Sequence, residues 1–174
     1  MSFFSLKNKL VAIPLKYGFF GSMIFILLFL IFYFLHLDPL VNIKIVDILI
    51  LAIFIFFSLK EFRDRYNERH LHFWQGMTGG IITYLSLAMI AAIFILIMTV
   101  IIDPDLTTKY IESRIALLME NKQALIDQMD ETTYNKALEG VKTTSGFDLA
   151  MDDFLKKSII GLFLTIIIAV ILRK

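Results

Sequence analysis

Cysteine is absent from this chain of 174 residues. Disulfides, thiolate zinc sites, iron–sulfur clusters and cysteine nucleophiles are therefore excluded. Proline, with three residues, and glycine, with eight, are too scarce for a collagen-like or low-complexity chain. An excess of charge of one sign is also lacking, because the formal net charge is only +1. Such a balance exerts no general attraction on nucleic acid, and we expect no nucleic-acid partner.

Apolar side chains are what the sequence has in excess. They make up 58% of the residues, phenylalanine alone accounts for 17, and the mean hydropathy is +0.77. A soluble domain is nearer half apolar, and a soluble chain of this length exposes too much surface to hide the surplus. Because the apolar residues lie in long blocks, the sequence predicts an all-α integral membrane protein that forms a single membrane domain over residues 1–174.

Four of these blocks are predicted transmembrane helices. The first covers residues 17–37, and the second, residues 43–59, is marginal in length. The third, residues 77–102, is longer than a bilayer requires. The fourth, residues 158–172, is short, and we expect the basic residues at its two ends to reach the membrane surfaces. These basic residues are Lys156, Lys157, Arg173 and Lys174.

The first block could instead be a cleaved signal peptide, because Lys7, Lys9 and Lys16 precede it. Its apolar core is too long for that role, however, and no small-residue cleavage site follows it. We therefore expect an uncleaved anchor. Upstream, residues 2–13 are compatible with a short helix on the membrane surface and equally with an unstructured tail.

The distribution of Lys and Arg predicts the orientation of the spans. With four spans, both ends of the chain share one side with the 60–76 loop. That side carries nine basic residues in short segments, whereas the other carries eight, seven of them among the eleven acids of residues 103–157. The density of positive charge places residues 1–16, the 60–76 loop and the C-terminus in the cytoplasm. Lys156 and Lys157 are the residues that argue against this orientation.

Two Asp-Pro pairs, Asp38-Pro39 and Asp103-Pro104, follow the first and third spans. Proline disfavours helix at the residue before it and is tolerated at the first position of the next helix. The preceding Asp side chain can accept hydrogen bonds from the free N–H groups of that next helix. We interpret each pair as the stop of one helix and the cap of another.

Residues 103–157 are expected to form an extracytoplasmic, amphipathic helical hairpin. Apolar residues recur at helical spacing over residues 107–129 and again over residues 133–142, with charged residues between them. The sequence DETT separates these two helices, and TTSG precedes a helix that runs from Phe147 into the fourth span. The apolar stripe can pack on its own fold or on lipid headgroups, or it can dock a partner helix.

The cytoplasmic loop has the composition of an interfacial segment. It contains the single tryptophan, which suits the aromatic belt at a membrane surface, and basic residues that hold the cytoplasmic side. The predicted interface anchors are Trp74, Lys60, Arg63 and Arg65.

Two groups of side chains are candidates for binding a divalent ion, one in each long loop. Neither has the dense spacing of a metal site, and two histidines two positions apart share a face on a strand but not on a helix. We therefore expect no resident metal and no cofactor. The two groups are Asp103 and Asp105 with Asp152 or Asp153, and His70 and His72 with Glu68.

Small residues recur at four-residue steps on the third and fourth spans, which allows helix backbones to approach closely. We expect these faces to pack helices together rather than to line a substrate path, since Gly and Ala offer no chemistry. The predicted packing residues are Gly76, Gly79, Gly80, Ala88 and Ala92 on the third span and Gly161, Thr165 and Ala169 on the fourth.

The order of these features resembles a known family. A K-x-x-R-like stretch at residues 60–63 is followed by F-x-x-G at 73–76, and the third span ends in I-D-P-D at 102–105. With the basic start, the acidic helical loop and the terminal span ending in basic residues, they resemble the small four-helix bacterial membrane proteins catalogued as domain of unknown function 4199. Members have Gly-Gly in the inner loop, where this chain has Glu-Arg-His at 68–70. The resemblance implies a multi-pass protein of the bacterial inner membrane and carries over no catalytic residue.

An enzyme needs a nucleophile, an acid–base pair or a metal, and the spans contain almost no ionisable group. Asp47 is the exception, and it is either a functional intramembrane carboxylate or a local partner of Lys44 at i, i+3. We therefore expect a non-catalytic accessory or scaffold subunit that acts through helix packing and its outer hairpin. Its expected partners are membrane lipids and either another membrane protein or further copies of the chain. The alternative is a homo-oligomeric pore or transporter for a small solute or lipid.

Overall fold

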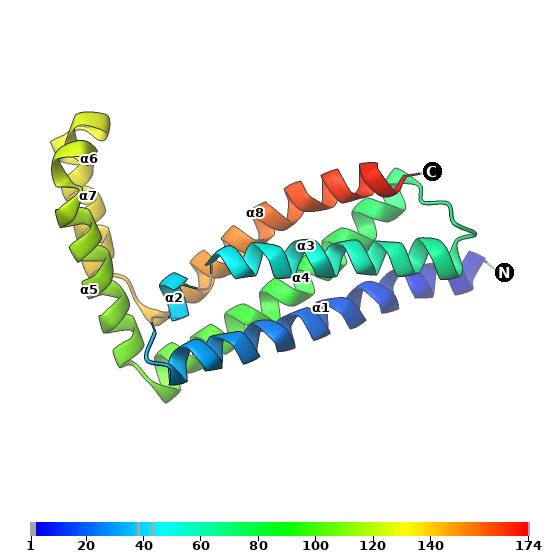
Figure 1. The fold of residues 1–174 in the computed structure, drawn as a ribbon, viewed down its shortest axis with the longest axis horizontal. Helices are drawn as coiled ribbons and strands as arrows, with labels where there is room; N and C mark the ends of the chain where they lie inside the picture. Colours follow the sequence, from blue (N-terminus) through cyan, green and yellow to red (C-terminus); the bar gives the residue numbers. More distant parts are fainter. Residues whose placement is uncertain (1–2, 38, 43, 174) are drawn as a thin grey trace. The chain divides into compact units, whose positions relative to one another are not determined.

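The computed structural model describes residues 3–37, 39–42 and 44–173 of the chain (Figure 1). In this described part all regular structure is helical and no strand occurs, so the prediction of an all-α chain is confirmed. The α-helices are α1 (Phe3–Phe34), α2 (Pro39–Asn42), α3 (Lys44–Glu61), α4 (Phe73–Ile97), α5 (Asp105–Glu120), α6 (Lys122–Met129), α7 (Glu131–Lys142) and α8 (Gly146–Leu172), and two π-helical turns are η1 (Phe62–Tyr66) and η2 (Met98–Ile102).

The chain divides into two compact units. Unit 1 combines Met1–Ile93 with Asp152–Lys174, and unit 2 is Phe94–Met151. Helices α4 and α8 each pass from one unit into the other, and the units are described separately below.

Unit 1 is a bundle in which α1, α3, α4 and α8 each run opposite to the preceding long helix, so that the start of α1 and the end of α8 lie at the same end (Figure 1). Leu51, Ile55 and Leu59 of α3 recur every fourth residue and are fully buried. Phe25 and Phe29 of α1 have the same spacing and burial. This periodicity turns one face of each helix towards the interior of the bundle.

The opposite faces of the same helices carry large, exposed apolar side chains. A surface of this kind is unfavourable in water and is suited to lipid, where apolar side chains need no cover. The exposed side chains include Phe20, Ile24, Leu27 and Ile31 of α1, Leu49, Ile53 and Phe57 of α3, and Phe163, Ile167 and Ile171 of α8.

Among the described residues, three helical segments are long and apolar enough to cross a membrane: Asn8–Phe34, Phe73–Ile102 and Gly146–Leu172. The predicted second span falls in α3, which has 18 residues and carries charged residues in its first and last turns. For that reason α3 is not among the three segments. The charged residues of α3 are Lys44, Asp47, Lys60 and Glu61.

Helix α1 begins earlier and ends earlier than the predicted span 17–37. It is continuous from Phe3 to Phe34, with Pro14 buried inside it. It ends where His36 adopts a positive φ of 57°. There the His36 N–H donates to the carbonyl of Tyr33 and the Leu37 N–H to that of Phe32, the bonding pattern of a Schellman motif.

The Asp103-Pro104 pair stops α4 through a π-helical turn. The Asp103 N–H donates to the Met98 carbonyl at 2.8 Å, and η2 ends at Ile102. The cap position before α5 is occupied by Pro104, one residue later than predicted, with no side-chain cap bond from it. The backbone carbonyl of Asp103 accepts from the Leu106 N–H at 3.2 Å.

At the other Asp-Pro pair, Pro39 is the first residue of α2, the position that proline tolerates because its missing N–H has no partner there. Asp38, the predicted cap, lies outside the described residues.

In unit 2 the predicted helix over residues 107–129 is two helices. Asn121 leaves the helical conformation between α5, which ends at Glu120, and α6, which begins at Lys122. Its side-chain amide and its backbone N–H both donate to the Leu117 carbonyl, and side-chain bonding of this kind disfavours Asn in helix interiors.

Helix α7 starts at the predicted cap in DETT and folds back against α5 and α6 (Figure 1). Asp130 has a positive φ of 69°, and its carboxylate accepts from the Thr133 N–H at 2.7 Å. Tyr134 of α7 is 3% exposed, and its hydroxyl donates to the Leu118 carbonyl of α5. One turn of α7 thereby attaches to α5.

Glycines in unit 1 lie where helices approach most closely. A side chain at Gly80 would meet Thr165, and one at Gly76 would meet Ala169, both on α8. A side chain at Gly161 would in turn meet the ring of Tyr84 on α4. The remaining predicted packing residues follow the same pattern: Gly79 faces Leu59 of α3, Ala88 is buried, and Ala92 is half-buried.

Replacing Gly80 tests this packing. A Cβ at Gly80 would lie 2.2 Å from Thr165 Cγ2 and 2.7 Å from its Oγ1. We expect Gly80→Ala to lower the free energy of unfolding in detergent micelles by about 1–3 kcal/mol, because α4 and α8 must move apart. Thr165→Ala removes both atoms, so adding Gly80→Ala to it should cost much less.

The matched control is Gly140→Ala in α7, where an added Cβ meets nothing within 4 Å. This substitution should be neutral or slightly stabilising, since it removes only chain entropy from the unfolded state. Equal losses for Gly80→Ala and Gly140→Ala would contradict the packing role.

Candidate functional site

The interior of unit 1 contains a lysine. Lys157 on α8 is 2% exposed, and its Nζ lies 2.6 Å from Oδ2 of Asp47 on α3. It also forms an ion pair with Asp153, one turn earlier on α8, and lies 4.1 Å from the centre of the Phe25 ring on α1. We call Asp47, Asp153, Lys157 and Phe25 the Lys157 cluster.

Local sequence accounts for half of this cluster. Asp153 and Lys157 are four residues apart on α8, the spacing at which a carboxylate and an ammonium meet on one helix face. Asp47 lies in the first turn of α3, whose opposite face carries Leu49 and Ile53 outwards. The packing of α3 against α8 then supplies the second carboxylate.

The charges of the cluster do not balance. Two carboxylates surround one ammonium, and burying an unpaired charge is costly unless hydrogen bonds compensate for it. Oδ1 of Asp47 and Oδ2 of Asp153 are buried and receive no hydrogen bond from the described residues. The Phe25 ring offers Lys157 a cation–π contact, which stabilises the ammonium rather than the carboxylates.

One prediction about these residues needs correction. Lys157 is predicted to reach a membrane surface together with Lys156, but only Lys156 is exposed, where it pairs with Asp152. Asp47, interpreted from the sequence as either a functional carboxylate or a local partner of Lys44, pairs with Lys157. The side chain of Lys44 lies outside the described residues. The signal that could have found the pair is that Asp47 and Lys157 were both predicted near the outer ends of their spans.

A second ionic cluster joins the opposite end of α3 to α1. The carboxylate of Glu61 accepts from Lys16 Nζ at 2.8 Å and from the Tyr17 hydroxyl at 2.7 Å, and Arg65 lies 3.6 Å away. Burial by itself raises the pKa of the Glu61 carboxyl, but the hydrogen bonds from Lys16 and Tyr17 outweigh it and hold that pKa below its ordinary value.

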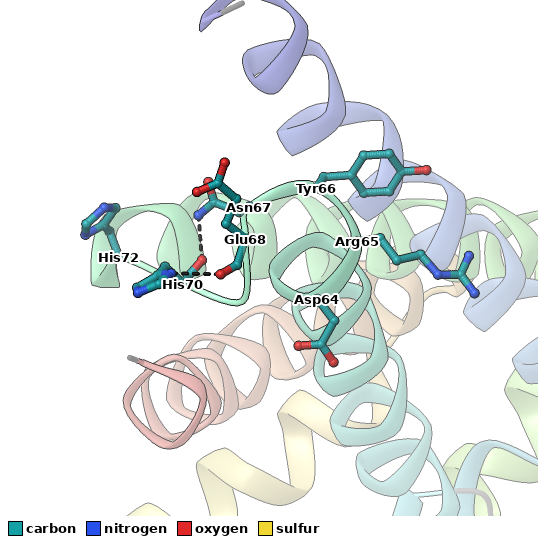
Figure 2. Close-up of a pocket in the computed structure, with 7 residues that line it drawn as sticks. All are labelled: Asp64, Arg65, Tyr66, Asn67, Glu68, His70 and His72. Carbon is teal, nitrogen blue, oxygen red and sulfur yellow. Dashed lines mark hydrogen bonds between the residues drawn. The ribbon is translucent and has the colours of Figure 1, made fainter. Parts of the chain in front are cut away.

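The loop between α3 and α4 surrounds an open hollow of about 470 Å³. Asn67 organises it, since its side-chain amide donates to the His70 carbonyl and to Oε1 of Gln75. Figure 2 shows the His70 and His72 rings at one end of the hollow and Arg65 pointing away at the other. The hollow is lined by Asp64, Arg65, Tyr66, Asn67, Glu68, His70 and His72.

The loop turns through two left-handed residues, Glu68 with φ 50° and Arg69 with φ 62°. A positive φ is the conformation that glycine adopts most readily, and here both positions carry a side chain. The Nδ1 atom of His70 lies 2.8 Å from the Glu68 carbonyl, which holds its ring against the turn.

No group of three His, Asp or Glu side chains in the described part of the chain is placed to hold a metal ion. His70 and His72 are both exposed. The polar groups of this loop bond mainly to one another and to the loop backbone, as Asn67, His70 and Gln75 do.

The predicted interface anchors lie at this end of unit 1. Trp74 is 79% exposed, and Lys60 lies over the Phe56 ring at 5.8 Å. Arg63 donates to Asp64 at 2.7 Å, and this hydrogen bond holds the pKa of the Asp64 carboxyl below its ordinary value. Arg65 approaches Glu61, as described above.

Helices with apolar outer faces, small-residue contacts between them and ionised groups enclosed inside define a helical membrane protein. The chain belongs to the family described as Protein of unknown function (DUF4199), whose model matches residues 16–174. This confirms the family that the sequence motifs suggested. No curated protein and no solved structure matches the chain.

The ionic cluster in which Glu61 contacts Lys16, Tyr17 and Arg65, here called the Glu61 cluster, predicts that the stability of the fold depends on pH. Because the pKa of Glu61 is lower in the folded chain than in the unfolded one, the ionised group stabilises the fold at neutral pH. This contribution is lost as the pH falls from the ordinary value of 4.5 through the folded-state pKa. Glu61→Gln should therefore cost about 1–3 kcal/mol of unfolding free energy at neutral pH and much less in acid.

The measurement is the thermal unfolding midpoint of detergent-solubilised protein at a series of pH values. Glu68→Gln, in the exposed loop, serves as the control and should follow the wild type throughout. If the Glu61→Gln and wild-type curves run parallel, the cluster does not stabilise the fold through this charge.

Proposed function

We propose that the chain is a four-span protein of the bacterial inner membrane, with both ends and the 60–76 loop in the cytoplasm and residues 103–157 outside. The antiparallel course of the unit 1 helices supports an even number of crossings, since α1 starts and α8 ends at the same end of the bundle (Figure 1).

Helix α3 forms the second of the four spans in this proposal, in addition to the three apolar segments described above. Its 18 residues extend about 27 Å, close to the thickness of a bilayer core. Its outward face is apolar, with Leu49, Ile53 and Phe57 at four-residue spacing. Two of its charged residues, Asp47 and Glu61, face partners on neighbouring helices, so they do not prevent the helix from lying in lipid.

A pair of reporter fusions tests this topology. Alkaline phosphatase is active only outside the cytoplasm, so we expect a fusion after Thr143 to be active and a fusion after Asn67 to be inactive. A green fluorescent protein fused at the same two positions should give the reciprocal result. The reverse pattern would overturn the orientation, and equal activity at both positions would show that α4, the proposed span between them, does not cross.

For its role, we propose a non-catalytic accessory or scaffold subunit that acts through helix packing. The supporting observation is that several hydroxyls within the helices bond to the bundle itself. Ser22 donates to the Phe19 carbonyl, and Thr83 donates to the Gly79 carbonyl while lying 2.9 Å from the Ser58 hydroxyl. Hydroxyls held in this way are structural and are not directed at a substrate. Thr165 differs, because its hydroxyl is packed against Gly80 and has no hydrogen-bond partner among the described residues.

A second candidate role, a homo-oligomeric pore or transporter, is favoured by one observation. Ionisable groups inside membrane helices frequently mark ion or proton pathways, and the Lys157 cluster is such a group.

Native mass spectrometry on the tagged protein, gently extracted from its own membrane, separates the two roles. The accessory role predicts a defined complex with a second membrane protein. A homo-oligomer without a partner would overturn the accessory role and favour the pore. The packing variant Gly80→Ala serves as the matched control for nonspecific association, because it should weaken the bundle without changing its charged residues or its exposed apolar surface.

A further inference from the structure

The unbalanced charge of the Lys157 cluster is largely enclosed. Asp47 is 8% exposed and Lys157 is 2% exposed, whereas the side chain of Asp153 is 21% exposed. One oxygen of Asp47 and one of Asp153 remain buried without a hydrogen bond from the described residues. When two such carboxylates share a single counter-charge, a proton retained by one of them removes the unbalanced charge.

The charged groups that act on Asp47 are Lys157, which attracts it, and Asp153, which repels it. Asp153 is additionally repelled by Asp152 and attracted by Lys156, both of which are exposed. Helix α1 presents an apolar ring, Phe25, to the ammonium. Lys44, whose side chain lies outside the described residues, is one turn from Asp47 and is treated below as part of the test.

We propose that the Lys157 cluster is a proton-binding site, in which Asp47 and Asp153 share a single proton across the Lys157 ammonium. With the proton bound, one carboxylate balances the ammonium and the neutral carboxylic acid can donate through its own hydrogen. Releasing the proton to water leaves a net charge of minus one between α3 and α8. The inference requires only that the cluster is buried, and it does not depend on the scaffold role or on the number of spans.

A proton fits this site better than a metal cation. A hard cation such as Na⁺ or Ca²⁺ needs several oxygen ligands around it, whereas only two carboxylate oxygens are free here. The ammonium already occupies the position between the carboxylates and would repel a second cation. A proton needs only a single oxygen, and it neutralises the one carboxylate that the ammonium does not balance.

Infrared difference spectroscopy of the purified protein during a pH titration detects the bound proton directly. A neutral carboxylic acid has a carbonyl stretch that is resolved from those of carboxylates and amides. We expect this band in the wild type, shared by two residues and disappearing as the pH is raised. Helical circular dichroism and size-exclusion elution establish that each variant is folded before its spectrum is compared.

Variants assign the band. Asp47→Asn and Asp153→Asn each leave one carboxylate for one ammonium, so either substitution should abolish the band. Lys157→Met leaves two carboxylates without a cation and should strengthen the band and extend it to higher pH. Asp152→Asn, which removes the exposed carboxylate paired with Lys156, is the matched control and should leave the amplitude unchanged.

Several outcomes would overturn the proposal. Absence of a titrating carboxylic-acid band in the folded wild type would show that both carboxylates are ionised. Loss of the band in Asp47→Asn but not in Asp153→Asn would show an isolated acid instead of a shared proton. A band that is strengthened or extended to higher pH in Lys44→Gln would place a second ammonium in the cluster and remove the charge imbalance on which the inference rests.

The pH dependence of the thermal unfolding midpoint is a second measurement, and it distinguishes a proton-binding site from a purely structural ion pair. A folded state that binds a proton which the unfolded chain releases must lose stability as the pH rises. The wild-type midpoint should therefore fall between the ordinary carboxyl pKa and the pH at which the band disappears, and should level off above that pH, while that of Asp47→Asn should stay flat and at least as high as the wild type at high pH. A lower midpoint for Asp47→Asn throughout this range would identify Asp47 as a structural partner only and overturn the proposal.

Discussion

Close approach between α4 and α8 is the constraint on which the rest of unit 1 depends. Lipid is as apolar as the side chains, so burying apolar surface contributes little to helix association and packing must supply the attraction. Gly80 and Gly161 make that packing possible, because a side chain at either position would collide with Thr165 or Tyr84 on the opposite helix. The same α8 also carries Lys157 to Asp47, so the register of this helix determines which charges meet.

Ion pairs between side chains hold both ends of the short helix α3. Glu61 ties its end to α1 through Lys16 and Tyr17, and Asp47 ties its beginning to α8 through Lys157. These charges exclude α3 from the segments that are apolar enough to cross a membrane when each helix is taken alone. Within the bundle they are partnered, and the cost of placing them in an apolar environment is reduced accordingly.

The two clusters differ in their electrostatic balance. Around Glu61 a single carboxylate receives several donors, which favours its ionised form. Around Lys157 two carboxylates, one buried and one half-buried, compete for one ammonium, and one oxygen of each has no donor among the described residues. The first arrangement stabilises the ionised carboxylate, whereas the second favours retention of a proton. This difference favours a chemical role for the Lys157 cluster even though the bundle as a whole is built for packing.

The sequence by itself determined the helical class, the long apolar segments, the family and the stop of α4 at Asp103-Pro104, because these depend on composition, local periodicity and short motifs. It also identified small residues such as Gly76 and Gly80, although not the residues that they contact. Local competition at Asn121 split a helix that periodicity predicted as one. Only the tertiary structure decided that Lys157 is buried against Asp47. A lysine at the end of an apolar segment can extend to the surface or turn inward, and the choice depends on whether a distant helix places a carboxylate within its reach.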